Sequence, residues 1–215
     1  GFLLASGHRR AGDRVAFDQL APFGGPMPRI VFAGPRGYNP RMFGGGPDAA
    51  LCRPGKGKRG FMDFAKARRN MVESQLRTNR VIDPAIVSAM GLVPREKFVP
   101  ENLASVAYLY VELALGDGRF LMGPMVFGRM LQEARPTSDD ATLLIGCGSG
   151  YAAVVLGKLC GAVFALESDS AVAAKGAALF SSHCADHVVV VEGPLAHGCS
   201  DEAPYSLMLF DVAVS

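Results

Sequence analysis

The sequence lacks the features that would place a protein in a membrane, outside the cell or around a metal ion. No run of about 18 uncharged apolar residues occurs, which is the length that a helix needs to cross a bilayer. The short apolar opening is interrupted at Gly7–Arg10, too early for a signal peptide. The five cysteines form no Cys-x-x-Cys pair, and the four histidines show no metal-binding spacing. We therefore expect a cytoplasmic protein with reduced thiols, no metal site and no membrane partner.

Residues 1–61 have little that could form a packed core. They hold 13 of the 26 glycines and 7 of the 14 prolines, in runs that break any helical or strand period. They also hold ten Lys or Arg against three Asp, which gives this segment a charge of +7. Aromatic residues are not interleaved with the basic ones, so the pattern does not indicate a specific nucleic-acid site. We predict a disordered, solvated arm over 1–61 that does not fold alone.

Residues 62–140 are predicted to form a helical region. Phe64, Ala67, Met71 and Leu76 are spaced as one face of a helix that begins near Asp63. Two further helices are expected after Asp83-Pro84 and from Pro124, because aspartate caps a helix and proline fits its first position.

Residues 141–215 alternate between short apolar runs and helical stretches, the pattern of strand-helix-strand units. We predict strands over 142–145, 163–167, 188–192 and 206–214, with helices over 150–160 and 170–182. The fold class is therefore α/β, with a doubly wound and mainly parallel sheet. The last strand would leave a hydrophobic edge unpaired, so we expect an incomplete sheet and a truncated chain.

A glycine-rich turn, Gly146-Cys147-Gly148-Ser149-Gly150, leaves the first of these strands and opens a helix. Such turns let a ligand approach the main chain closely. Tyr151 stands where a dinucleotide-binding turn requires a third glycine, and no lysine follows until Lys158, which disfavours a P-loop. A purely structural turn remains the alternative.

Glu167 ends the second strand, where a carboxylate can accept hydrogen bonds from both ribose hydroxyls. Gly193 and Leu195 follow the third strand at the position that would receive an adenine ring. The alternatives are a solvated carboxylate at a strand end and an ordinary exit from a strand.

Several motifs together resemble the protein-L-isoaspartate O-methyltransferases, which are class I, Rossmann-like methyltransferases. The resemblance covers about 62–214. The matching stretches are Met71-Val72, Gln75-Leu76-Arg77, Ile82-Asp83, Val93-Pro94-Arg95-Glu96-Lys97-Phe98-Val99-Pro100, Ala107-Tyr108, Leu115-Gly116-Asp117-Gly118, Pro124-Met125, the Gly146 turn, Ala165-Leu166-Glu167 and Ala203-Pro204-Tyr205.

The resemblance implies a protein-repair enzyme. It implies that Gly146, Cys147, Gly148, Gly150 and Glu167 hold S-adenosylmethionine, with Gly193 and Leu195 beside them. The methyl group would pass to the free carboxyl of L-isoaspartyl residues in damaged proteins, and a monomer is expected. A carboxylate is already ionised at neutral pH, so this reaction needs no strong general base.

Two residues on the substrate side depart from the family pattern. Met122 stands where a hydroxyl-bearing serine is expected, and Asp117 stands where many members have histidine. Arg119 could pair with a substrate carboxylate, or be a solvated loop arginine. Two alternatives therefore stay open: a methyltransferase for another substrate, and a truncated, catalytically silent remnant that binds the cofactor.

Overall fold

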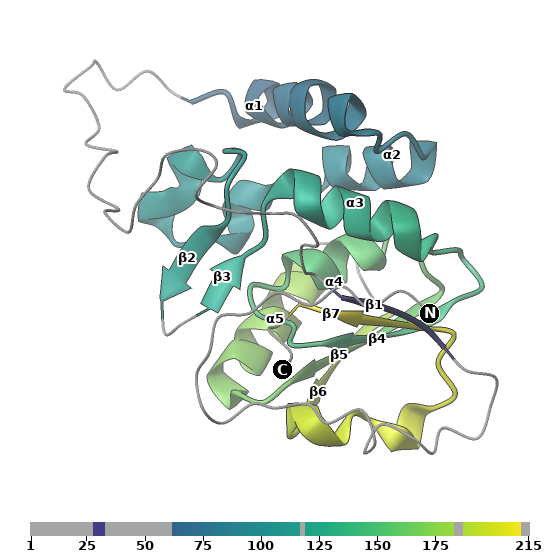
Figure 1. The fold of residues 1–215 in the computed structure, drawn as a ribbon. Helices are drawn as coiled ribbons and strands as arrows, with labels where there is room; N and C mark the ends of the chain where they lie inside the picture. The colour runs from purple at the N-terminus through teal and green to yellow at the C-terminus, as the bar shows by residue number, and fades with distance from the viewer. Residues whose placement is uncertain (1–27, 33–61, 117–118, 183–186, 212–215) are drawn as a thin grey trace.

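The computed structural model describes residues 28–32, 62–116, 119–182 and 187–211 (Figure 1). A five-stranded parallel sheet has the order β1-β7-β4-β5-β6, and a separate antiparallel pair is formed by β2 and β3. The strands are β1 (Arg29–Phe32), β2 (Leu113–Gly116), β3 (Arg119–Leu121), β4 (Ala141–Ile145), β5 (Ala162–Glu167), β6 (Val188–Glu192) and β7 (Leu207–Phe210).

Helices precede the sheet in sequence and alternate with its strands. The α-helices are α1 (Phe64–Met71), α2 (Pro84–Leu92), α3 (Pro124–Ala134), α4 (Tyr151–Leu156) and α5 (Ser170–Ser182). A π-helical segment, η3 (Val72–Leu76), continues α1. The 3-10 turns are η4 (Arg77–Asn79), η5 (Arg95–Phe98), η6 (Glu101–Val106), η7 (Leu195–His197) and η8 (Ser200–Glu202). None of the helices in the described residues is long and apolar enough to cross a bilayer.

The α/β fold class predicted from the sequence is confirmed. From β4 the chain passes through α4 to β5 and through α5 to β6, moving outward in one direction. It then returns to the other side of β4 as β7. This reversal creates a switch point between β4 and β7, and ligands of such folds bind beyond the carboxyl ends of the strands there.

Alternate residues of the buried strands face two different cores. Leu144 packs in the larger core with side chains of α3 and α4, such as Leu131 and Val154. Leu143 and Ile145 face the opposite side with the smaller core. Figure 1 shows the α-helices above and behind the sheet and the short turns η7 and η8 below it. Both faces are therefore covered, as continuously apolar parallel strands require.

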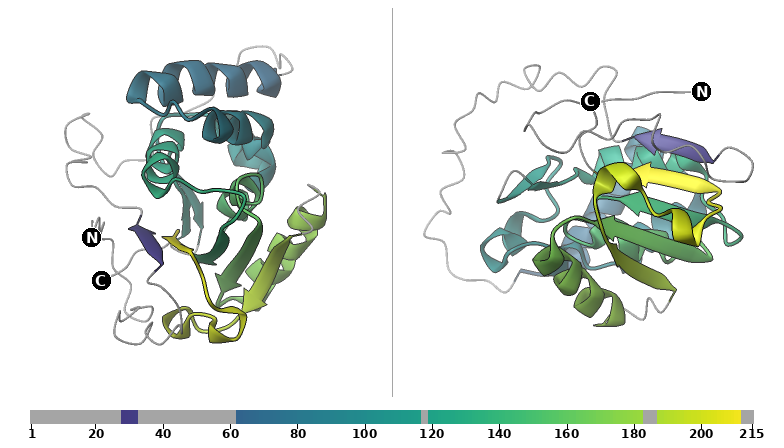
Figure 2. Two further views of the ribbon diagram at one scale, coloured as in Figure 1. Left: turned by 90° about the vertical axis from the view of Figure 1, so that its right-hand side faces the viewer. Right: turned by 90° about the horizontal axis from the view of Figure 1, so that it is seen from below.

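Strand β1 corrects the expectation of an unpaired edge. It pairs with β7 in parallel from Arg29 opposite Leu207 to Phe32 opposite Phe210, so β7 is an inner strand (Figure 2). These four residues, three of them apolar, are enough to form a strand because the edge of β7 offers backbone groups for hydrogen bonding. At 29–32 the chain thus differs from the arm predicted there. The rest of 1–61, apart from Pro28, lies outside the described residues.

Arg29 fastens β1 to the neighbouring layer. Its Nη1 donates to the carbonyls of Ala134 (3.0 Å) and Arg135 (2.7 Å) at the end of α3, and its Nη2 pairs with Asp140 (2.5 Å). Burial acts to raise the pKa of Asp140, but hydrogen bonds from Ser206, Arg29 and Thr137 outweigh it and lower that pKa. The strand is therefore held at its edge and also from the helical side.

The helical region follows the sequence prediction in part. The Asp83 side chain accepts hydrogen bonds from Ala85 N (2.8 Å) and Ile86 N (3.4 Å), which confirms the predicted cap of α2. Within the region predicted to be helical, Leu113–Gly116 and Arg119–Leu121 instead form the β2–β3 hairpin. This hairpin brings Arg119 toward the carboxyl ends of the sheet strands, as its contact with Glu167 shows.

Candidate functional site

The glycine turn after β4 lies at the switch point. Gly146, Gly148 and Gly150 have φ values of 78°, 52° and 82°, in the left-handed region that favours glycine. The N–H groups of Gly146 and Cys147 donate to the Leu166 carbonyl (2.9 and 3.2 Å), which fixes the turn against β5. A Cβ added at Gly148 would have only the Gly146 carbonyl oxygen within 4 Å, at 3.9 Å. The main chain there is therefore open to a ligand.

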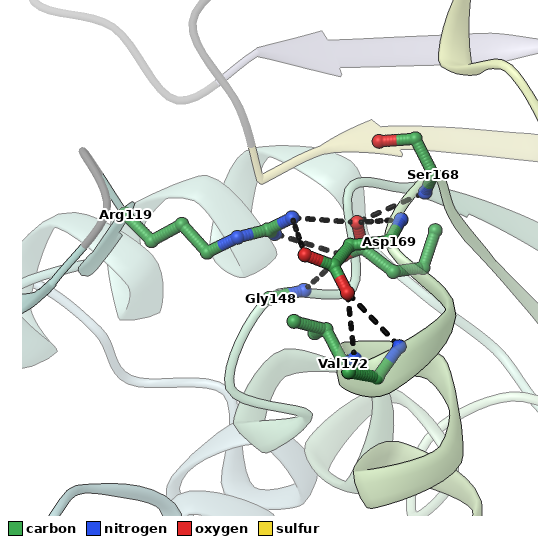
Figure 3. A network of polar contacts seen from close by, with 7 residues as sticks. Arg119, Gly148, Ser168, Asp169 and Val172 are labelled. Atoms are coloured by element: carbon green, nitrogen blue, oxygen red, sulfur yellow. Dashed lines mark hydrogen bonds and ion pairs between the residues drawn. The ribbon is translucent and has the colours of Figure 1, made fainter.

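Glu167, at the end of β5, accepts a hydrogen bond from this turn. Figure 3 shows Arg119, Gly148, Ser168 and Asp169, which all donate to it, close together. Glu167 has no exposed surface, and the Gly148 N–H donates to its Oε2 at 3.0 Å. Its Oε1 accepts from the N–H groups of Ser168 (2.9 Å) and Asp169 (3.2 Å). The carboxylate and the glycine turn are thus in direct contact, and their binding of a cofactor stays a prediction.

Arg119 completes the coordination of Glu167. Its Nη1 donates to Oε2 at 3.1 Å and its Nη2 to Oε1 at 3.0 Å. Burial acts to raise the pKa of Glu167, but the hydrogen bonds from Arg119, Gly148 and Asp169 lower it. The same contact raises the pKa of Arg119. Arg119 is therefore neither a solvated loop residue nor, in this state, free to meet a substrate.

The other predicted site residues lie at different depths. Gly193 N–H donates to the Glu167 carbonyl (3.0 Å), so it adjoins the site. Leu195 is 6% exposed and packs in the smaller core, and its contact with an adenine ring stays a prediction. Cys147 is fully buried, and burial raises its pKa to about 12, so only its main chain is available.

Among the substrate-side candidates, Met122 packs against the larger core and Asp117 lies outside the described residues. The Met122 carbonyl accepts a hydrogen bond from Arg95 Nη2 at 2.5 Å. The structure thus brings Arg119 and the glycine turn together, whereas the Met122 side chain packs against the larger core.

Three polar residues near the site have no role in the sequence analysis. Asp211 follows β7, and its N–H donates to the Ile145 carbonyl (3.0 Å) directly before the glycine turn. Burial raises the pKa of Asp211 to about 8; Arg95 opposes this rise and Glu167 adds to it. The Arg95 guanidinium lies 5.1 Å from the ring centre of the buried Tyr151. The sequence signal that could have identified Asp211 is an acidic residue directly after an apolar strand.

Comparisons with known proteins agree on one family. The family model for protein-L-isoaspartate(D-aspartate) O-methyltransferase matches residues 66–215. A protein-L-isoaspartate O-methyltransferase of Synechococcus sp. is 37% identical over 150 residues, which cover 70% of this chain and 62% of that protein. Protein-L-isoaspartate O-methyltransferase 1 of Rhodopseudomonas palustris is 35% identical over 146 residues, which cover 68% of this chain and 60% of that protein. The chain thus spans about three fifths of the length of these relatives.

Solved structures show the same fold. A protein-L-isoaspartate O-methyltransferase superposes with a TM-score of 0.60 at 21% identity, covering 66% of this chain and 47% of that one. A second structure is a putative protein-L-isoaspartate O-methyltransferase from Plasmodium falciparum in complex with S-adenosyl-L-homocysteine. It superposes with a TM-score of 0.50 at 17% identity, covering 59% of this chain and 62% of that one.

Proposed function

Because the chain belongs to the protein-L-isoaspartate(D-aspartate) O-methyltransferase family, we propose that it transfers a methyl group from S-adenosylmethionine to the free carboxyl of L-isoaspartyl residues in damaged proteins. The observation that carries this proposal is the buried Glu167 carboxylate, hydrogen-bonded to the main chain of the glycine turn at the switch point. This is the place where folds of this class bind an adenosyl ligand and its ribose.

The residues present fit this cofactor. Glu167 places a carboxylate where a ribose diol would lie, and the open main chain at Gly148 lets an adenosyl group approach. When bound, the cofactor supplies an electrophilic methyl group on its sulfonium. The chain has to bind the acceptor carboxylate, align one oxygen with that methyl group and exclude water.

Asp211 bears on the charge that a carboxylate acceptor would meet. With a pKa of about 8, its carboxyl is mainly protonated at neutral pH. A neutral carboxyl at the edge of the site adds no repulsion against an anionic acceptor. This property supports a carboxylate as the methyl acceptor.

Calorimetry with S-adenosylhomocysteine tests the cofactor site. Glu167→Ala should weaken binding by about 5- to 150-fold, which corresponds to about 1–3 kcal/mol for lost buried hydrogen bonds. Glu192→Ala is the matched control, because Glu192 ends β6 directly opposite Glu167 in the register but is exposed. Equal affinities of the two variants would contradict the proposed site.

A labelled-methyl assay with an isoaspartyl peptide tests the reaction. The proposal expects a methyl ester on the isoaspartyl peptide and none on the matching aspartyl peptide. A second candidate is methyl transfer to another acceptor, favoured by β3, whose Arg119, Phe120 and Leu121 carry no hydroxyl. Cofactor binding without ester formation on either peptide would support the second candidate.

The proposed setting follows from the same function. Isoaspartyl-containing proteins would be the partners, and a monomer acting in the cytoplasm is proposed. Reduced thiols support this setting, because Cys147, Cys160 and Cys199 are all free in the described part of the chain.

A further inference from the structure

The Glu167 carboxylate already has as many hydrogen bonds as it can accept. Five N–H groups donate to its two oxygens, at distances of 2.9 to 3.2 Å, and they belong to Arg119 (two), Gly148, Ser168 and Asp169. A carboxylate offers about four lone-pair positions. A ribose diol that donates two further hydrogen bonds therefore has no vacant position at this carboxylate.

The backbone donors to Glu167 are fixed by the surrounding fold. Gly148 belongs to the turn that is held to the Leu166 carbonyl through its neighbours. The segment carrying Ser168 and Asp169 leads into α5, where Asp169 Oδ1 accepts from Ala171 N (2.9 Å) and Val172 N (3.1 Å). Displacing these donors would disturb the strand end or the helix start.

Arg119 is the donor that can leave without such a disturbance. Its side chain extends from the β2–β3 hairpin, is 30% exposed, and can rotate about several single bonds. Removing its two hydrogen bonds leaves three donors on about four lone-pair positions, so one position opens on Oε2 for a ribose hydroxyl.

A second carboxylate lies within reach of the departing guanidinium. Asp169 Oδ2 is 3.9 Å from Arg119 Nη2, and the Asp169 side chain is 48% exposed. Oδ1 of the same residue makes the α5 cap, so Oδ2 can take Arg119 without loss of that cap. The guanidinium therefore stays paired while it moves.

We propose that Arg119 and the ribose of the adenosyl ligand replace each other as hydrogen-bond donors to Glu167. The Arg119 guanidinium holds Glu167 while no adenosyl ligand is bound, and it moves toward Asp169 when a ribose hydroxyl takes its place at Oε2. The pair spares Glu167 the cost of a buried, unpartnered charge in the ligand-free protein. The cost of separating the pair lowers the affinity for the ligand. This inference rests on the proposed function, since it requires that an adenosyl ligand binds here.

Calorimetry with S-adenosylhomocysteine on wild type and Arg119→Met tests the exchange. Methionine keeps a long apolar stem and offers no donor. The variant should bind roughly three- to tenfold more tightly, because no ion pair has to be separated. Arg119→Lys, which keeps the charge, should stay near the wild type. Arg129→Met is the control, because Arg129 pairs with Glu133 at 3.5 Å on the surface of α3.

A further measurement keeps the test independent of how well the variant folds. The melting temperature of Arg119→Met should be below that of wild type without ligand and closer to it at saturating ligand.

The possible results separate this inference from the proposed function. Binding by wild type with equal or weaker binding by Arg119→Met would overturn the exchange alone. Absence of binding in both proteins would overturn the proposed function together with it.

Discussion

Arg95 is a charged side chain with no exposed surface. Its Nε donates to the Ala107 carbonyl (2.6 Å) and its Nη2 to the Met122 carbonyl (2.5 Å), while its Nη1 has no hydrogen-bond partner in the described residues. Burial lowers the pKa of Arg95, and the nearby Tyr151 and Asp211 oppose this effect. Arg95 thereby ties the segment before α3 to the turn that precedes β2.

Arg95→Met should lower the free energy of unfolding by about 2–4 kcal/mol, because two enclosed carbonyls lose their charged donor. Urea denaturation followed by circular dichroism measures this change. Arg69→Met, on an exposed position of α1, should stay within about 0.5 kcal/mol of wild type. Similar losses in both variants would show that the buried contacts of Arg95 do not matter.

Asp211 makes stability depend on pH. Its folded-state pKa is about 8 against an ordinary value of 3.8, so between these values the folded chain holds more protons at this site than the unfolded chain. The free energy of unfolding should therefore fall as pH rises through this window and level off above it. Asp211→Asn should be more stable than wild type at pH 8.5, with a difference that shrinks toward pH 4. A difference that does not vary with pH would contradict the raised pKa.

The sequence placed Glu167 and the glycine turn at the ends of neighbouring strands because strand ends and turns have local sequence signals, and their role in holding the cofactor stays a prediction. It did not predict that Arg119 would pair with Glu167. The two residues belong to different parts of the chain, and only the hairpin geometry brings them together. No role was predicted for Arg95 either, because its hydrogen-bond acceptors are backbone carbonyls, which cannot be recognised from residue types.

At the scale of elements, the predicted bounds agree best with the structure where one local sequence signal determines the helix or strand. Helix α5 spans the predicted 170–182, and β6 spans the predicted 188–192. The helix predicted from Asp63 changes instead to a π-helical segment at Val72. There the Gln75 side chain donates to the Tyr108 carbonyl at 2.8 Å. That contact depends on tertiary structure, so the spacing of apolar residues could not predict it.

The junction between α4 and β5 gives an element-scale prediction. A Cβ at Gly161 would overlap the carbonyl oxygen of Ser138, which belongs to the main chain and cannot rotate away. Gly161→Ala should therefore destabilise the fold by about 1–3 kcal/mol in thermal or urea unfolding.

Gly91→Ala in α2 is the matched control for Gly161→Ala. Its new methyl group would meet only a Val72 methyl, at the ordinary distance of 3.6 Å. It should be neutral or stabilising by up to about 1 kcal/mol, because alanine favours the helix. Equal effects of the two substitutions would argue against the close approach at Gly161.

At the scale of the whole molecule, composition misled the prediction at β1. Glycine, proline and arginine dominate 1–61, and the four residues Arg29–Phe32 are too few to register against that background. What makes them a strand is the free edge of β7, a partner that lies far away in the sequence. The order of the other four strands follows from the alternation of strands and helices.

A substitution in β1 tests whether this strand completes the sheet in solution. Val31 packs against the larger core, so Val31→Asp should lower the free energy of unfolding by about 1–3 kcal/mol. Val189→Asp is the control, because Val189 lies on β6 at the opposite edge and is 48% exposed. Unchanged stability of Val31→Asp would mean that β1 contributes nothing to the fold.

The pairing of β1 with β7 also affects the order in which the sheet folds. It joins residues 29–32 to residues 207–210, which lie far apart in the sequence, so its loop closes late and at a large entropic cost. During synthesis the ribosome releases residues 29–32 long before their partner strand exists. The strand must therefore wait while the rest of the sheet assembles, and it joins only when β7 emerges.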